Sequence, residues 1–152
     1  MASVIIAGVG AYTPERILTN DDLTKMVDTS DEWIRTRSGI RERHIAGPDE
    51  ACSDLGIKAA TAALKDANID ASEVDLLIVA TATPDYPLPS TACVVQHKLG
   101  VPPHATAFDI AAACSGFVYA LEIAYGQLLT GRYKCALIIG SEKLSSIVDW
   151  SD

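Results

Sequence analysis

One cysteine stands in the part of the chain best suited to covalent chemistry, the run DIAAACSGFVYALEIA of Asp109–Ala124. Cys114 follows three alanines and precedes Ser-Gly, where a strand-like pattern gives way to a helical one. The first N–H groups of a helix are unpaired and carry the positive end of its dipole, which favours a thiolate. Such settings lower a cysteine pKa from about 8.5 to about 3.5–7.5. Cys114 is therefore a candidate nucleophile towards a carbonyl, with the same N–H groups able to hold an oxyanion.

An inert packing role for Cys114 stays open on spacing alone, because free cysteine is among the most buried residue types. The other cysteines lack a strand-to-helix junction preceded by small residues, and we expect Cys52, Cys93 and Cys135 to be packing residues. The chain contains no CxxC pair, which argues against a zinc site or a thioredoxin-type motif. We therefore expect reduced thiols.

A basic island stands out in a chain whose formal net charge is -8, formed by Arg35, Arg37, Arg41 and Arg43. The overall charge argues against a general binder of nucleic acid or anionic membrane, because the mean field repels polyphosphate, and leaves a local basic patch possible. Guanidinium groups can nevertheless hold a phosphate in a bidentate way. The alternative is a solvated helix face and loop whose arginines pair with Glu32 and Glu42.

Apolar runs of strand length alternate with helical patterns along the chain. The predicted strands are Val4–Val9, with a tight turn at Gly8 and Gly10, then Leu76–Thr81, Ala105–Ile110 and Cys135–Ile139. The segment GVGAYTP departs from a dinucleotide fingerprint, because Thr13-Pro14 stands where the third glycine and the helix start belong. The alternation predicts an α/β fold with a mixed, largely parallel sheet.

Helix boundaries are indicated by capping residues. Thr19–Asp22 and Thr29–Glu32 each have the form of a capping box, with the hydroxyl residue at the N-cap and Trp33 in the first turn of the second helix. The remaining predicted helices run from Cys52 or Ser53 to about Asp66, from Ser90 through Leu99, and from Ser115 to about Leu129. Pro84, Pro87 and Pro89 predict a loop before Ser90.

The helix from Ser115 carries Glu122 as its one charge and is apolar around most of its circumference, which predicts burial on all sides. One sheet covers one side of a helix, so we expect a partner or a missing half to cover the other. The length of 152 residues fits a single domain. No stretch approaches the roughly 20 apolar residues that span a bilayer, and no cationic leader precedes the first apolar run, so a cytoplasmic location is expected.

Three separated motifs resemble one family: GVGAYTPERILTN at Gly8–Asn20, TSDEWIRTRSGIRERHIA at Thr29–Ala46, and DIAAACSGF at Asp109–Phe117. They are similar to β-ketoacyl-[acyl-carrier-protein] synthase III, the initiating condensing enzyme of bacterial fatty-acid synthesis. The resemblance covers essentially the whole chain. It implies the thiolase fold, in which two similar α/β halves stack with a central buried helix from each. Residues 1–152 then form an N-terminal half-domain, and the C-terminal half is not in this sequence.

By this resemblance, Cys114 accepts an acyl group from an acyl-coenzyme A, and malonyl-acyl carrier protein then decarboxylates and condenses with the thioester. Trp33 would stack on the adenine of coenzyme A, with Arg37 and Thr29 at the nucleotide end. Leu88 matches the position that reaches across a homodimer interface to shape the acyl pocket, although an ordinary loop anchor remains an alternative.

The family's catalytic histidine and asparagine belong to the second half, and His44, His97 and His104 do not match that histidine's motif. We expect no metal and no permanently bound cofactor. Alternatives are a related condensing enzyme with another starter acyl group and a non-catalytic half-fold that acts as an interaction partner.

Overall fold

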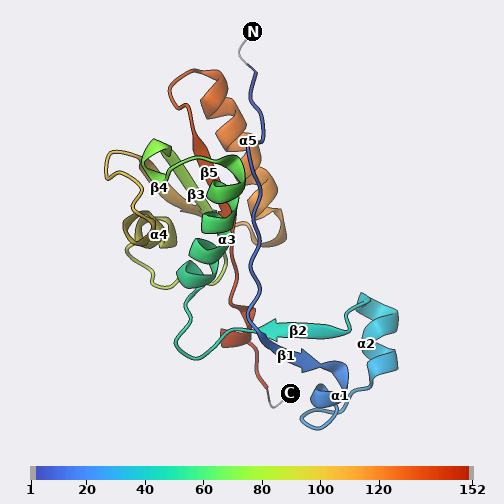
Figure 1. Ribbon diagram of the computed structural model, residues 1–152. Helices are drawn as coiled ribbons and strands as arrows, with labels where there is room; N and C mark the ends of the chain where they lie inside the picture. Colours follow the sequence, from blue (N-terminus) through green and yellow to red (C-terminus); the bar gives the residue numbers. More distant parts are fainter. Residues whose placement is uncertain (1–2, 151–152) are drawn as a thin grey trace. The chain divides into compact units, whose positions relative to one another are not determined.

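The computed structural model describes residues 3–150 and divides the chain into two compact units. The first unit contains Met1–Tyr12 and Ala51–Glu142, and the second contains Thr13–Glu50 and Lys143–Asp152. Figure 1 traces the chain through both units.

A three-stranded parallel sheet forms the centre of the first unit, in the order β4-β3-β5. The strands are β3 (Leu76–Ala80), β4 (Thr106–Ile110) and β5 (Ala136–Gly140). Every residue of the middle strand β3 is buried, as expected for a parallel strand covered on both faces. The three strands coincide with predicted ones to within a residue or two, and the α/β fold class is confirmed.

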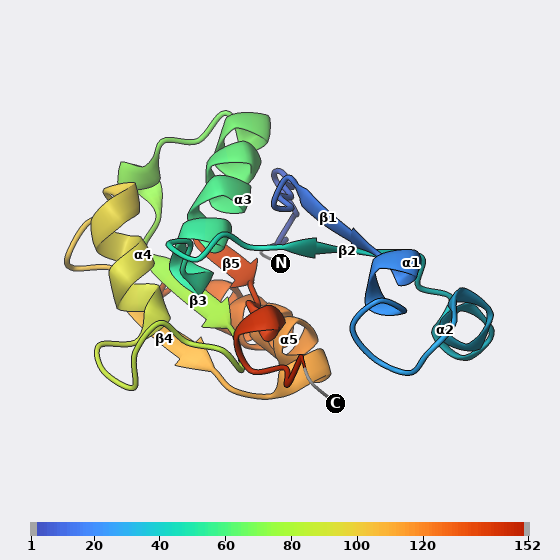
Figure 2. The ribbon, with the colours of Figure 1, turned by 90° about the horizontal axis from the view of Figure 1, so that it is seen from below.

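Helices cover both faces of this sheet, as Figure 2 shows. α3 (Cys52–Ala67) and α4 (Thr91–Leu99) pack on one face, where Leu77 and Val79 enter their core. α5 (Gly116–Leu129) packs on the other face, against Leu76 and Ile78. The alternation of β3 side chains thus serves both layers.

The predicted ends of α3 and α4 are confirmed, because local caps determine them. Asn68 ends α3 in the left-handed conformation, with φ 53°. The hydroxyl of Ser90 accepts a hydrogen bond from the backbone N–H of Cys93, and Gly100 ends α4 with φ 80°. The proline segment between β3 and α4 is a loop, as predicted.

The prediction of a buried strand at Val4–Val9 is wrong. The segment forms no strand, and Ile5 and Ile6 are each 78% exposed. A strand needs a neighbour for its N–H and C=O groups, and the described residues offer this segment none; instead the Val9 N–H donates to Asp66 Oδ2 on α3 at 3.0 Å.

The glycines of this segment also differ from their prediction as turn residues. A Cβ at Gly8 would lie 2.7 Å from the carbonyl oxygen of Ala63, and one at Gly10 would overlap the backbone of α3. The glycines therefore permit a close approach to α3 rather than a tight turn.

The second unit is built around an antiparallel pair, β1 (Arg16–Thr19) and β2 (Glu42–Ile45). Between these strands lie α1 (Asn20–Leu23) and α2 (Asp31–Ser38). The capping box of Thr19 and Asp22 is confirmed. The N-cap predicted at Thr29 is wrong by one residue: Ser30 caps α2, its hydroxyl accepting from the N–H of Trp33 at 3.1 Å. The Ser30 side chain reaches that N–H from an extended backbone, and this replaces a capping box.

The apolar helix α5 is covered on one side within its unit. Only Gly116, Ala120 and Ala124 are buried, whereas Val118 is 61% and Tyr125 53% exposed. The expectation that the sheet covers one side of this helix and leaves the other uncovered is confirmed for the described residues. Among those same residues, no helix is long and apolar enough to cross a membrane.

Candidate active site

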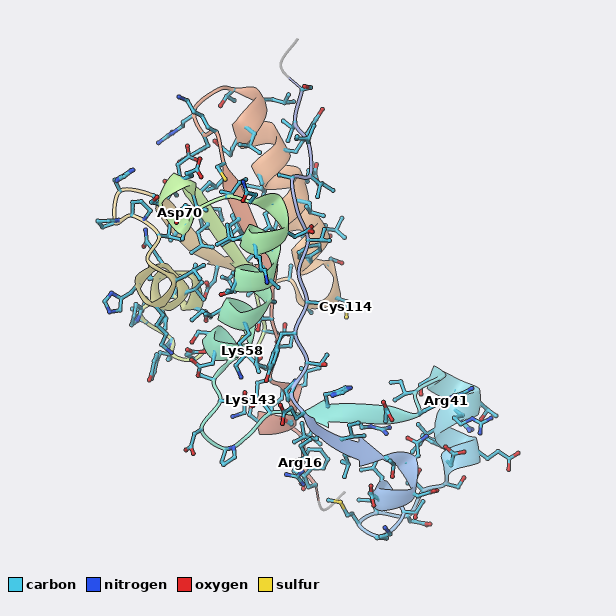
Figure 3. The ribbon with its side chains drawn as sticks, viewed as in Figure 1. Arg16, Arg41, Lys58, Asp70, Cys114 and Lys143 are labelled. Carbon is cyan, nitrogen blue, oxygen red and sulfur yellow. The ribbon has the colours of Figure 1, made fainter. Side chains whose placement is uncertain are left out.

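Cys114 lies in a single 3₁₀ turn, Ala113–Ser115, that joins β4 to α5. Its side chain is exposed, and Figure 3 labels it at the surface near the first turn of α5. The predicted position of Cys114 between a strand and a helix N-terminus is therefore confirmed. The alternative of a buried packing cysteine is wrong, because the thiol is exposed.

The residue before the cysteine has an unusual backbone. Ala113 has φ 44°, in the left-handed region that non-glycine residues rarely adopt. The turn is closed by the N–H of Ser115, which donates to the carbonyl of Ala112 at 3.1 Å. Strained residues of this kind persist where surrounding structure imposes them, and they concentrate at functional sites.

Two glycines allow α5 to begin directly over the ends of the strands. A Cβ at Gly116 would lie 3.1 Å from the Cβ of Ala80, at the end of β3. A Cβ at Gly140, which ends β5, would lie 3.2 Å from the ring of Phe117. The first turn of α5 is thus packed against the carboxyl ends of both strands, where α/β sheets commonly bind ligands.

The N-terminus of α5 has no side-chain cap. Its N-cap residue, Ser115, makes no capping hydrogen bond with its side chain. The N–H groups of Ser115 and Gly116 donate to the carbonyls of Ala112 and Ala113, so what the start of α5 offers the sulfur of Cys114 is the positive end of the helix dipole. The turn therefore combines an accessible thiol with the positive end of the α5 dipole.

Asp109 is a residue of the motif whose role the sequence did not reveal. Its two carboxylate oxygens accept hydrogen bonds from the N–H groups of Thr91 and Ala92, each at 2.7 Å. They cap the N-terminus of α4 from the end of β4. The carboxylate therefore ties α4 to the strand that leads to Cys114, and no local pattern could have shown this contact.

Glu142 makes a second connection that sequence reasoning missed. Its carboxylate accepts from the N–H of Ala82 at 2.8 Å and from the hydroxyl of Thr83 at 2.7 Å. These contacts join the end of β5 to the start of the proline loop. That loop carries Leu88, whose side chain is 86% exposed.

The other cysteines differ from Cys114. Cys52 is buried, and its thiol donates to the carbonyl of Ser141 at 3.1 Å. Burial raises the pKa of the Cys52 thiol. It also raises the pKa of the Cys135 thiol, which is half-buried. All four thiols are free, and Cys93 is half-buried.

Two of the predicted nucleotide-binding side chains, Trp33 and Arg37, lie on α2 in the second unit. The guanidinium of Arg37 lies 4.5 Å from the ring centre of Trp33, one helical turn away. The indole is 54% exposed. Thr29 is half-buried and lies immediately before the N-cap of the same helix. An indole with a stacked guanidinium offers one aromatic face and a set of phosphate donors.

The predicted residues thus form two groups: Cys114 and Leu88 in the first unit, and Thr29, Trp33 and Arg37 in the second. The three histidines are exposed, and the ring of His44 is hydrogen-bonded to the carbonyl of Pro14. Within residues 3–150, no cluster of His, Cys, Asp and Glu has the makings of a metal site.

Known proteins resemble this chain in sequence. The family model described as 3-Oxoacyl-[acyl-carrier-protein (ACP)] synthase III matches residues 108–152. A beta-ketoacyl-[acyl-carrier-protein] synthase III of Caldanaerobacter subterraneus subsp. tengcongensis is 56% identical over 147 residues, which cover 97% of this chain and 44% of the relative. The protein of the same name from Clostridium acetobutylicum is 54% identical over 152 residues, covering 100% of this chain and 46% of the relative.

Solved structures agree. The 3-oxoacyl-[acyl-carrier-protein] synthase III of Aquifex aeolicus VF5 superposes with a TM-score of 0.93 at 53% identity, covering 97% of this chain and 47% of that one. The priming β-ketosynthase of the R1128 polyketide pathway gives 0.92 at 37% identity, covering 97% and 44%. The chain spans somewhat less than half the length of the relatives it matches. Across nearly all of its own length, the chain belongs to the β-ketoacyl-[acyl-carrier-protein] synthase III family.

Proposed function

We propose that this chain supplies the acyl-accepting half of a condensing acyltransferase that initiates fatty-acid synthesis. The observation that carries the proposal is the exposed thiol of Cys114 at the uncapped N-terminus of α5. Family membership supports the same reaction, because the relatives are named for the synthesis of 3-oxoacyl-acyl carrier protein.

In the first step, the thiolate of Cys114 attacks the thioester carbonyl of an acyl-coenzyme A. Negative charge develops on the carbonyl oxygen close to the N-terminus of α5, where the positive end of the helix dipole stabilises it. The carbon–sulfur bond to coenzyme A then breaks, and its thiolate leaves and takes up a proton. The acyl group remains on Cys114 as a new thioester.

In the second step, malonyl-acyl carrier protein loses carbon dioxide, and the electron pair of the broken bond forms an enolate. This carbanion attacks the acyl carbonyl on Cys114, which releases the cysteine sulfur and leaves 3-ketoacyl-acyl carrier protein. The enolate needs hydrogen-bond donors, and the family resemblance assigns them to a histidine and an asparagine of the second half. We therefore propose that the C-terminal half completes the site and covers the exposed side of α5.

Coenzyme A is the proposed ligand of α2. The adenine would stack on the face of Trp33 that Arg37 does not cover, while Arg37 and Thr29 contact the nucleotide end. The supporting observations are the exposed indole and the stacked guanidinium. Coenzyme A then acts as a substrate and carrier, with no permanently bound cofactor.

A homodimer is the proposed assembly. Two features support it: β4 pairs on one side only among the described residues, and Leu88 projects from its loop with an exposed fraction of 86%. An unpaired strand edge and an exposed leucine both favour contact with a second chain. In that assembly, Leu88 would line the acyl pocket of the partner.

Fusion of this chain to the C-terminal half of the Caldanaerobacter relative tests the function. The fusion should form acetoacetyl-acyl carrier protein from acetyl-coenzyme A and malonyl-acyl carrier protein, and the chain alone should form none. Mass spectrometry of the carrier protein measures the product.

Cys114→Ala in the same fusion is the matched control and should abolish condensation. Steady product from the isolated chain would contradict the need for a second half. A folded fusion whose Cys114 stays unacylated would instead favour the non-catalytic interaction partner.

A related condensing enzyme with a different starter is the second candidate, favoured by the similarity to the R1128 priming β-ketosynthase. Acylation of Cys114 by acetyl-, isobutyryl- and octanoyl-coenzyme A, compared at equal concentration, distinguishes the two. Faster acylation by a longer or branched donor supports this candidate, whereas preference for acetyl-coenzyme A supports the first.

A further inference from the structure

Asn20 is a buried polar residue at the base of α2, outside the set of proposed ligand contacts. It is the first residue of α1, directly after β1, and only 2% of it is exposed. Its backbone N–H donates to the carbonyl of Arg41 at 3.2 Å. Burying a side-chain amide costs free energy unless its donors and its acceptor are paired. The hydrogen-bond partners of Asn20 therefore indicate which segments it connects.

The side-chain amide of Asn20 contacts both ends of α2. Its nitrogen donates to Asp31 Oδ1 at 2.8 Å and to the carbonyl of Ile40 at 2.9 Å. Asp31 is the first residue of α2, and Ile40 follows Gly39, the C-cap of that helix. The amide oxygen accepts from Arg43 at 2.5 Å. Only this orientation of the amide places donors against acceptors at all three contacts.

α2 has little else to hold its orientation. It is eight residues long, and Ile34 is its single buried residue. A helix of two turns is marginal by itself, and one buried side chain leaves it free to rotate about its axis. The hydrogen bond from Asn20 also lowers the pKa of Asp31, and more than the hydrogen bond from Arg35 does. Polar anchors at the two ends therefore contribute much of what fixes α2.

The face of α2 opposite these anchors carries the proposed ligand contacts. Trp33 and Arg37 are four residues apart and lie on one exposed side, with the guanidinium of Arg37 over the indole ring of Trp33. Stacking on a flat base depends on the angle of the indole, so rotation of α2 would reduce affinity without removing any contact residue.

We propose that Asn20 is a positioning residue for nucleotide binding, acting through both ends of α2 to hold Trp33 and Arg37 in the orientation that receives an adenine nucleotide. The inference rests on the proposed function, because it assumes that coenzyme A binds on this helix.

A double-mutant cycle on the 152-residue chain tests this, with coenzyme A as the probe and calorimetry as the measurement. Trp33→Ala should weaken Kd by about tenfold, and Asn20→Ala by about fivefold. In the Trp33→Ala background, Asn20→Ala should change Kd by less than about twofold, because residues that act through one contact are not additive. A merely structural role for Asn20 would not produce that non-additivity.

Two further variants guard against a general loss of folding. Asp31→Ala removes the partner on α2 and leaves Asn20 in place, so it should reproduce the Asn20→Ala result. Val95→Ala opens a cavity in the core of the first unit, where Val95 is fully buried, and should lower stability while leaving Kd unchanged.

A failure of the positioning role of Asn20 can be distinguished from a failure of the proposed nucleotide site. Unchanged Kd in Asn20→Ala, or effects that add in the double variant, would overturn the inference and leave the nucleotide site standing. No binding by the wild-type chain, or equal binding by Trp33→Ala, would overturn the proposed nucleotide site and the inference with it.

Discussion

Single residues show how surroundings separate two thiols in one fold. Cys114 is exposed on a strained turn, whereas Cys52 is 2% exposed and its pKa is raised by burial. The thiolate is the reactive form, and a buried thiol has neither access nor charge.

Alkylation should therefore distinguish the two cysteines. At neutral pH, iodoacetamide should modify Cys114 first and Cys52 only when urea unfolds the chain, as followed by peptide mass mapping. The half-buried Cys93 and Cys135 provide internal references of intermediate exposure. Modification of Cys52 as fast as Cys114 in the native chain would contradict the structure.

The position of the nucleophile could be predicted from residues, but its supports could not. Cys114 was found because a strand-to-helix change and small neighbours are adjacent in the sequence. The left-handed backbone of Ala113 and the bonds from Asp109 to the start of α4 depend on contacts between segments that are far apart. Sequence patterns within one segment cannot predict contacts of this kind.

In α5, the atoms around each glycine determine whether replacing it by alanine stabilises or destabilises the fold. Gly116 leaves room for the Cβ of Ala80, while a Cβ at Gly126 would meet nothing within 4 Å. Glycine inside a helix costs about 0.5–1 kcal/mol relative to alanine.

Gly126→Ala should therefore stabilise the chain by about 0.5–1 kcal/mol, and Gly116→Ala should destabilise it. Urea unfolding followed by circular dichroism measures both, and each variant is the matched control for the other. Equal stabilisation by both substitutions would show that α5 does not pack closely on β3.

The capping box of α1 predicts a specific dependence on pH. Lys25 and Thr19 hold the pKa of Asp22 at about 2, against an ordinary value of 3.8. A carboxyl whose pKa is lower in the folded state stabilises it fully above its unfolded pKa, and this stabilisation is lost as pH falls through the folded value.

The stability difference between wild type and Asp22→Asn should therefore be constant above about pH 5 and narrow as pH falls towards about 2. Other carboxyls titrate in both proteins and cancel in the difference. Unfolding midpoints measured across this range provide the test, and a difference that stays unchanged to pH 2 would contradict the capping geometry.

Elements with local signals could be predicted, and those that depend on a distant partner could not. Ser90 and Gly100 delimit α4 within ten residues, and the structure has the same boundaries. Val4–Val9 has the composition of a strand but no partner strand in the described residues, so the pattern misled. The N-cap of α2 was displaced from Thr29 to Ser30 because two adjacent hydroxyls satisfy the same rule.

On the scale of the whole molecule, α5 has more apolar surface than its own sheet can cover. The helix keeps several large apolar side chains exposed, among them Val118 and Tyr125. A contiguous apolar surface of this kind favours association. The sequence predicted this shortage of cover, although it did not identify which residues face the sheet.

Val118→Lys should reduce self-association of the chain and change its stability by less than about 0.5 kcal/mol, because the side chain is exposed. Ala124→Lys is the matched control on the buried side, at 1% exposure, and should unfold the chain by burying a charge. Sedimentation velocity and circular dichroism measure the two effects. Equal disruption by both would mean that α5 is enclosed in the isolated chain.

Acyl transfer to Cys114 is the central claim, and the intact mass of the chain after incubation with acetyl-coenzyme A tests it most directly. The wild-type chain should gain one acetyl group on the Cys114 peptide, and this gain should be present in Cys93→Ala and absent from Cys114→Ala. An unmodified wild-type chain, or an acetyl group that persists in Cys114→Ala, would contradict it.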